Sequence, residues 1–162
     1  FFLVTPQFFL ILVIVAFIGP SIWNIIGVIG VFSWPRAARI VRAETLSLRE
    51  RDFVQAGRAI GGSKLHIILR HIIPNVISSV IVIASLEVGR AILLETGISF
   101  LGLGAKVGQP EWGLMLRDHF TLIRQAPWTV LAPGLAIFSM VLGFNLLGDG
   151  LRDILDPQVK TT

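Results

Sequence analysis

The 162-residue sequence contains no cysteine and few charged residues. Without cysteine it can form no disulfide, no thiol nucleophile and no cysteine-based metal site. Only 15% of its residues are Asp, Glu, Lys or Arg, against about 25% in soluble domains. Hydrophobic residues make up 54% of the chain. This balance favours a membrane protein over a soluble one.

Complete nucleotide-binding and catalytic motifs are also lacking. The run GRAIGGSK at residues 57–64 places Ser63 before Lys64, whereas a phosphate-binding loop needs the lysine directly after its second glycine. The run GLGAKVG at residues 102–108 lacks dinucleotide-binding spacing and better fits a tight turn or a re-entrant segment. No nucleophile, base and orienting group occur together in a recognisable motif. We therefore expect no catalytic residues and no cofactor.

Potential metal ligands are poorly spaced. His66 and His71 are five residues apart, which separates them around an α-helix, so we interpret them as interfacial residues rather than a metal pair. Asp149, Asp153 and Asp156 lie among glycine and proline, a context that predicts a helix end and its turn. The sequence thus predicts no metal site.

Four apolar blocks follow one another along the chain, over residues 1–18, 22–34, 72–94 and 128–147. A helix needs about 20 residues to cross a hydrocarbon core of about 30 Å, so the last two blocks are long enough and the first nearly so. The second becomes long enough if its helix continues through Pro35 into the basic segment, with arginines reaching lipid headgroups. Buried helices of a soluble protein are the alternative. We predict an all-α membrane protein, a polytopic bundle of about four transmembrane helices.

Charge asymmetry predicts the orientation of these helices. Residues 36–71 hold eight of the fourteen basic residues and three acidic ones, whereas residues 95–127 hold only three basic residues. The positive-inside rule then makes residues 36–73 a cytoplasmic loop and residues 95–127 an extracytoplasmic loop. Because the basic residues adjoin membrane spans and lack an aromatic stacking platform, we expect them to contact membrane lipid and not nucleic acid.

Two short helices are predicted in the cytoplasmic loop. The first covers residues 47–60, with Ser47 and Glu50 as a capping box and two glycines at its end. The second begins at Ser63 and ends before Pro74.

One face of the first short helix carries small residues. Phe53, Ala56, Gly57 and Ile60 share this face at helical spacing, and small side chains let another chain approach closely. A partner-binding helix and a helical hairpin lying on the membrane surface both fit this pattern. The residues alone leave these two interpretations open.

Several separated sequence blocks carry a family resemblance. Gln55-Ala56-Gly57, then Gly61, then Ile72-Ile73-Pro74 resembles the cytoplasmic EAA signature of permeases in binding-protein-dependent ABC importers. More closely, the chain is similar to the C-type subunit of the dipeptide/oligopeptide/nickel permease group. The blocks that carry this similarity are WPRAAR at 34–39, RHIIPN at 70–75, SFLGLG at 99–104, WG at 112–113, and NLLGDGLRD at 145–153 followed by DP at 156–157.

This resemblance implies a permease subunit that does no chemistry itself. Two homologous permease subunits would form a pathway for peptides or nickel, two cytoplasmic ATP-binding subunits would hydrolyse ATP, and an extracytoplasmic binding protein would deliver the substrate. The location implied is a bacterial or archaeal inner membrane, which the chain crosses several times. The first short helix would be the coupling helix that docks on the ATPase, through Phe53, Gln55, Ala56, Gly57, Ile60 and Gly61.

Three features depart from the family pattern. Gln55 and Gly57 stand where the family usually has Glu and Ala. Family members usually carry further N-terminal spans, so we expect residues 1–162 to be one N-terminally truncated transmembrane domain. Glu87 and Arg90 lie within the third apolar block, where small or apolar residues are expected.

At spacing i,i+3, Glu87 and Arg90 share a helix face and can pair, which lowers the free-energy cost of charge in lipid. The pair is either a neutralised structural contact or a polar contact on the substrate path. The latter leads to an alternative function, a partner-independent channel or secondary carrier that uses Glu87 and Arg90 as an ion or proton relay.

Overall fold

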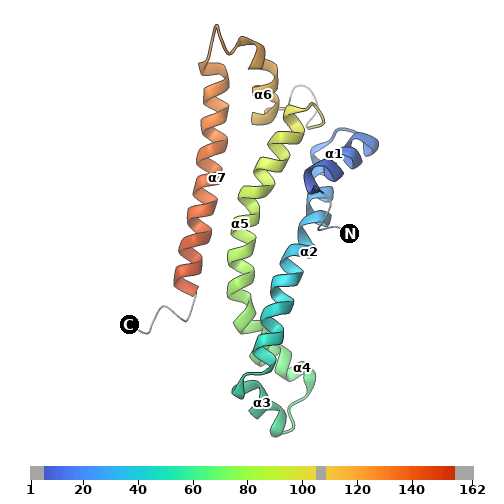
Figure 1. Cartoon of the computed structure of the whole chain (residues 1–162), viewed down its shortest axis with the longest axis vertical. Helices are drawn as coiled ribbons and strands as arrows, with labels where there is room; N and C mark the ends of the chain where they lie inside the picture. The colour runs from blue at the N-terminus through green and yellow to red at the C-terminus, as the bar shows by residue number, and fades with distance from the viewer. Residues whose placement is uncertain (1–5, 105–108, 156–162) are drawn as a thin grey trace. The chain divides into compact units, whose positions relative to one another are not determined.

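The computed structural model describes residues 6–104 and 109–155, and these ranges contain helices, turns and bends but no strand. The all-helical prediction is therefore confirmed for this part of the chain. The elements in order are α1 (Gln7–Ile18), α2 (Ile22–Arg49), α3 (Asp52–Ala59), α4 (Lys64–Ile67), the π-helix η1 (Ile68–Ile72), α5 (Ile73–Phe100), α6 (Trp112–His119), the 3₁₀ turn η2 (Phe120–Leu122) and α7 (Trp128–Leu155) (Figure 1).

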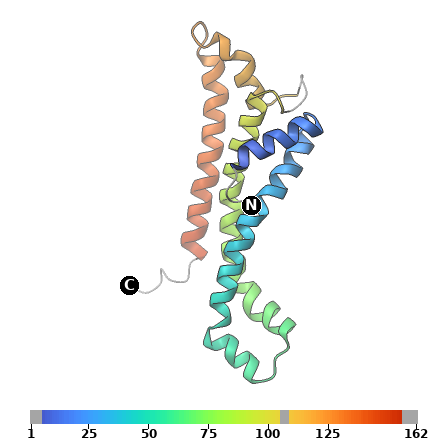
Figure 2. The same cartoon turned by 45° about the vertical axis from the view of Figure 1, so that its right-hand side comes forward.

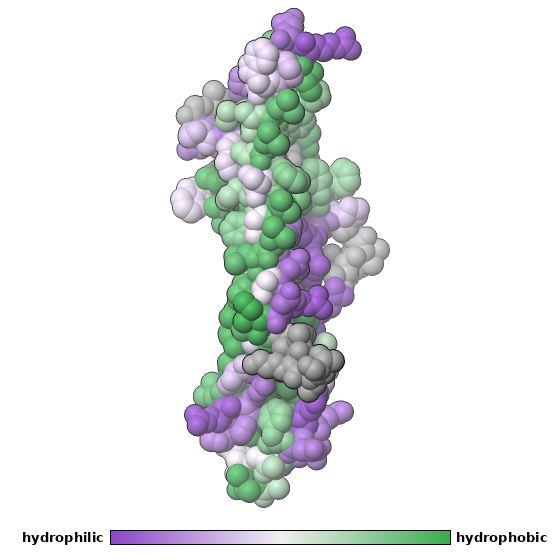
Figure 3. Space-filling model, turned by 90° about the vertical axis from the view of Figure 1, so that its left-hand side faces the viewer, coloured by the Kyte–Doolittle hydropathy of each residue, from purple (hydrophilic) through white to green (hydrophobic). Residues whose placement is uncertain are grey.

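Two helical segments among the described residues are long and apolar enough to cross a membrane. They are the continuous run Lys64–Phe100, which contains α5, and α7. Helix α1 has 12 residues, fewer than the roughly 20 that a crossing needs. Hydrophobic side chains cover much of one face of the molecule (Figure 3). Two helices of the described residues thus have the length and apolarity for a crossing, and the prediction of four crossings stays a prediction.

Helix α2 differs from the prediction at its C-terminal end. Its predicted continuation through Pro35 is confirmed, since Pro35 lies inside the helix. The helix also runs past Ser47 to Arg49, so the predicted capping box at Ser47 is wrong. Val41 and Leu48, seven residues apart on one face, pack against a buried cluster, and this burial outweighs the capping preference of Ser47.

Pro74 does not end the second short helix as predicted, because α5 continues through it. The π-helix η1 ends at Ile72, two residues before Pro74, and the amide of Ile73 donates to the carbonyl of Ile68, five residues back. Proline lacks an N–H and its ring crowds the preceding turn of an α-helix. The wider π turn accommodates the ring, so the chain stays helical.

Helix α7 also continues beyond its predicted end at Asp149 and Asp153, as far as Leu155; Asp156 lies outside the described residues. The glycine before this point has a packing role. Gly148 is buried, and a Cβ built on it would lie 2.8 Å from Leu86 Cδ2. The glycine therefore allows close helix contact instead of ending the helix.

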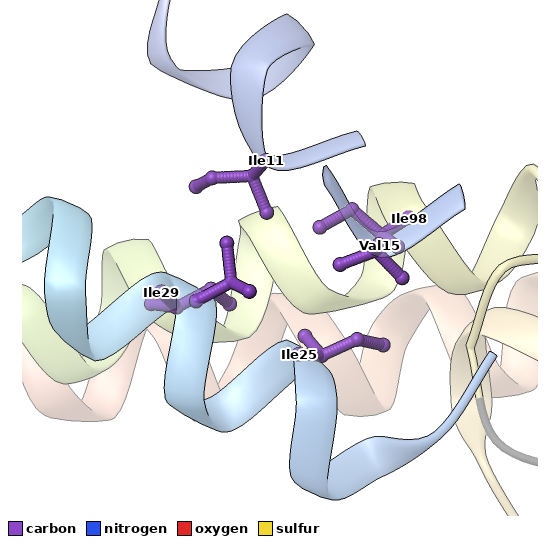
Figure 4. Packing of buried hydrophobic residues seen from close by; sticks show 6 residues of the cluster. Ile11, Val15, Ile25, Ile29 and Ile98 are labelled. Carbon is purple, nitrogen blue, oxygen red and sulfur yellow. The ribbon is translucent and has the colours of Figure 1, made fainter. Parts of the chain in front are cut away.

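Contacts between Cα atoms divide the chain into two compact units. Unit 1 comprises Phe1–Ser33 and Glu87–Asn145, and unit 2 comprises Trp34–Leu86 and Leu146–Thr162. In unit 1, α1 turns back against the first part of α2 (Figure 2). The buried cluster there joins α1, α2 and α5, and the side chains of Ile11, Val15, Ile25, Ile29 and Ile98 converge in it (Figure 4).

The C-terminal end of α5, also in unit 1, is closed by a glycine turn. Gly102 has φ +88°, and its amide donates to the carbonyl of Ser99 at 2.9 Å. The amide of Leu103 donates to the carbonyl of Ile98 at 3.1 Å. These two bonds form a Schellman motif. The predicted tight turn is thus confirmed up to residue 104; residues 105–108 lie outside the described part.

Candidate functional site

A hairpin of two short helices connects α2 to α5 within unit 2 (Figure 2). Val54 of α3 is fully buried and packs with Ile67, Ile72 and Val76, from α4, η1 and α5 respectively. Leu48 of α2 lies against the same cluster. The hairpin is therefore anchored to both long helices by one small core. Val54 is a residue that the sequence interpretation missed; its signal is an apolar side chain at one side of the face considered.

Two glycines fix the turn at the end of α3. Gly61 has φ +83°, which L side chains adopt only with strain. Its amide donates to Arg58 at 3.0 Å, and the amide of Gly62 donates to Gly57 at 3.0 Å, a second Schellman motif. A Cβ on Gly62 would lie 2.6 Å from the Gly57 carbonyl oxygen. The predicted helix end at the two glycines is confirmed.

Helix α4 begins at once after this turn. The Ser63 side chain accepts a hydrogen bond from the amide of His66 at 3.2 Å, as the N-cap of α4. The predicted start of the second helix at Ser63 is thus confirmed. Because a C-terminal motif and an N-cap follow each other without a linker, the path of the hairpin is determined by local backbone contacts.

The four residues predicted to share a face of α3 divide into two pairs. Ile60 is 87% exposed and Ala56 is also exposed. Phe53 and Gly57 instead border His71: the two rings of Phe53 and His71 are 6.1 Å apart, and a Cβ on Gly57 would lie 3.5 Å from His71 Nε2. Ala56 and Ile60 therefore form the open part of this face, with Phe53 partly exposed beside them.

Gln55 has an intramolecular hydrogen-bond partner. Its side-chain amide donates to the carbonyl of Glu50 at 3.1 Å. An ionised glutamate at this position would have no hydrogen to donate to that carbonyl. Gln55 thus helps to join the end of α2 to α3.

His66 and His71 lie closer together than their spacing on an α-helix predicts. Their ring centroids are 6.0 Å apart and the rings are tilted by 70°. The predicted separation around a helix is wrong because the intervening residues form a π-helix, whose wider turn brings residues five apart onto one face. With Gly57, Ile60, Gly61, Gly62 and Ser63 they line a cavity of about 330 Å³.

Glu87 and Arg90 form the predicted pair, with Arg90 Nη1 3.7 Å from Glu87 Oε1. Arg90 Nη2 also donates to Gln7 Oε1 of α1 at 2.9 Å, so the arginine connects α5 to α1 within unit 1. The pairing is confirmed, and these contacts suit a structural role. A place for the pair on a transport path stays a prediction.

Comparison with known proteins covers almost the whole chain. A family model described as "Binding-protein-dependent transport system inner membrane component" matches residues 1–161. The chain is 47% identical over 156 residues to the dipeptide transport system permease protein DppC of Alkalihalophilus pseudofirmus, an alignment covering 96% of this chain and 51% of that protein. It is 45% identical over 155 residues to the glutathione transport system permease protein GsiD of Escherichia coli, again covering 96% and 51%.

The chain spans about half the length of the curated relatives it matches. Within that half, the alignments include both long apolar helices and the whole hairpin, since they omit only a few of the 162 residues. The chain therefore belongs to the family of binding-protein-dependent transport system inner membrane components.

Proposed function

We propose that this chain is part of the transmembrane permease subunit of an ATP-driven peptide importer, and that α3 is its contact with a cytoplasmic ATPase. The relatives named above are permease proteins of dipeptide and glutathione transport systems, which supports a peptide substrate over nickel. The observation that carries the coupling role is the anchored hairpin: α3 buries Val54 in the core of unit 2 and exposes Ala56 and Ile60.

The anchoring suits the transmission of movement. Val54 contacts a cluster that includes side chains of both α2 and α5, so a displacement of α3 acts on both long helices at once. A packed element of this kind transmits a shift because its contacts rearrange as a body. The ATPase can shift the permease between two conformations only if its binding free energy differs between them. The contact at α3 would have to be present in both conformations for that difference to act on the long helices.

The proposed coupling residues have different roles. Ala56 and Ile60 would contact the ATPase, with the edge of Phe53, which is 42% exposed. Gln55, Gly57 and Gly61 would shape the helix and its turn through the contacts already described. A burial-driven contact of this type gains most of its binding free energy from a few central side chains, and Ile60, the C-cap of α3, is a large hydrophobic side chain that is 87% exposed.

The proposed topology has four crossings, through the apolar blocks that begin at residues 1, 22, 72 and 128, in a bacterial or archaeal inner membrane. Residues 36–73 would lie in the cytoplasm because they carry most of the basic residues, and residues 95–127 would lie outside. The chain would have no catalytic activity. A second permease subunit, two ATP-binding subunits and an extracytoplasmic binding protein would complete the importer.

Uptake in proteoliposomes tests this function. The full-length permease would be reconstituted with its second permease subunit, ATPases and binding protein, and uptake of labelled dialanine measured. We expect uptake that requires ATP and stops when the ATPase subunits are left out. Uptake that continues without them would instead identify the partner-independent carrier, with Glu87 and Arg90 as its first candidates.

A further inference from the structure

A groove of about 850 Å³ within unit 2 combines acidic, basic and hydroxyl groups. Its volume lies within the roughly 300–1,000 Å³ typical of small-molecule sites. Residues of α2, α5 and α7 line it together with Arg51 and with Phe53 of α3. The polar residues used below are Glu44 of α2, Asn75, Ser78 and Ser79 of α5, and Arg152 of α7.

The carboxylate of Glu44 is only half satisfied. Its Oε1 accepts a hydrogen bond from the hydroxyl of Ser79. Its Oε2 is buried and has no hydrogen-bond partner among the described residues. An ionised carboxylate only accepts hydrogen bonds, and leaving such an oxygen buried without a donor is unfavourable. A ligand ammonium would supply both the missing donor and the opposite charge.

Arg152 provides the complementary charge from another helix. It lines the groove from α7, and α7 lies close to α5 at this level because Gly148 faces Leu86 without a Cβ between them. The guanidinium is a planar donor suited to carboxylates. The groove therefore offers an acceptor for a cation and a donor for an anion, and Asn75 is also in its lining as a partner for an amide group.

We infer that this groove binds a short peptide as a zwitterion, with the N-terminal ammonium at Glu44 and the C-terminal carboxylate at Arg152. The inference rests on the proposed function, because peptide import is what brings such a ligand to the groove. A lysine of a partner subunit would present the same ammonium chemistry to Glu44. The experiment separates these two sources.

A cysteine reporter measures occupancy directly. These 162 residues contain no cysteine, so Ser78→Cys places a new thiol in the groove. The alkylation rate by N-ethylmaleimide would be measured on the assembled transporter in proteoliposomes, with dialanine, N-acetyldialanine or dialanine amide. We expect dialanine to slow alkylation, and each blocked compound to need a concentration roughly tenfold higher for the same protection.

Two variants assign this protection to its groups. Glu44→Gln should remove the preference for dialanine over N-acetyldialanine, while alkylation without peptide stays at the parent rate. Ser79→Ala keeps the carboxylate and should keep the preference, whereas a merely structural role of Glu44 would make both variants behave alike. Arg152→Gln should remove the preference over the amide. A thiol at exposed Ile81 on the same helix should show no protection.

Several results would overturn the inference. One is equal protection by all three compounds, and another is protection that survives Glu44→Gln. A third is slow alkylation without peptide that Glu44→Gln accelerates, since a partner's basic side chain would then occupy the groove. Dialanine uptake by the same vesicles separates the proposals: uptake without protection contradicts the groove site alone, whereas absent uptake contradicts the import function.

Discussion

The turn after α3 offers a sharp test of how the hairpin is held. Gly61 has φ +83°, and a Cβ built on it meets no atom within 4 Å. Replacing it with alanine therefore adds no steric contact, and the whole effect must come from the backbone conformation. Asparagine tolerates this conformation better than alanine, so Gly61→Asn is a matched control.

The expected magnitude follows from the conformational penalty. An L-residue in the left-handed region costs about 1–2 kcal/mol, which multiplies the population of the opened hairpin by about 5- to 30-fold. Gly61→Ala should show this change and Gly61→Asn a smaller one. Gly143→Ala should leave the hairpin unchanged, because Gly143 lies in α7 with open space around its Cβ position.

Amide hydrogen exchange on the assembled transporter would measure this opening. Exchange of residues 52–62 should accelerate by the factor above in Gly61→Ala, since exchange reports local opening free energies. ATP hydrolysis stimulated by the substrate-loaded binding protein should fall in parallel. Identical exchange in the alanine, asparagine and native proteins would refute the idea that this turn holds α3 in place.

Three further predictions concern burial, exposure and helix contact. Val54→Ala removes two buried carbons from the hairpin core and should destabilise it by about 2 kcal/mol, seen as faster exchange of α3; unchanged exchange would contradict the anchoring role. Ile60→Asp should reduce capture of the cognate ATPase by more than about tenfold without changing the hydrogen exchange of α3. Ile154→Asp, at another highly exposed position, should retain capture of the ATPase. Equal capture by the two variants would show that the ATPase does not dock at Ile60. Gly113→Ala would place a Cβ 2.7 Å from Ser99 Cβ and should cost about 1–3 kcal/mol of packing between α6 and α5, so protection of α6 that stays native would disprove this close contact.

Features determined by local chemistry can be predicted from the sequence. The long charge-poor runs predict the long apolar helices α5 and α7, because helix length and apolarity can be counted from the sequence. Gly61 and Gly62 predict the end of α3, since few other residues allow this turn. The i,i+3 spacing predicts the contact between Glu87 and Arg90 because it follows from helix geometry alone.

Features that depend on packing could not be predicted in this way. The extension of α2 past Ser47 depends on burial of Leu48 against the cluster that contains Val54, which is visible only once the hairpin has folded. The π turn before Pro74 is a response to a proline in a helix that tertiary contacts keep continuous. The contact between His66 and His71 follows from that same turn. The coupling role of the α3 face stays a prediction, and the division of that face between internal and open contacts is visible only in the structure.

Site-specific cross-linking most directly tests the claim that an ATPase drives this permease through α3. Because these 162 residues lack cysteine, Ala56→Cys introduces one thiol on the open face of α3. A short thiol-reactive cross-linker would be applied to the assembled transporter during ATP-driven uptake. The control is Ala43→Cys, at an exposed position of α2. We predict a cross-link to the ATPase from Ala56→Cys and none from Ala43→Cys. No cross-link from Ala56→Cys in a transporter that still takes up peptide would contradict the account.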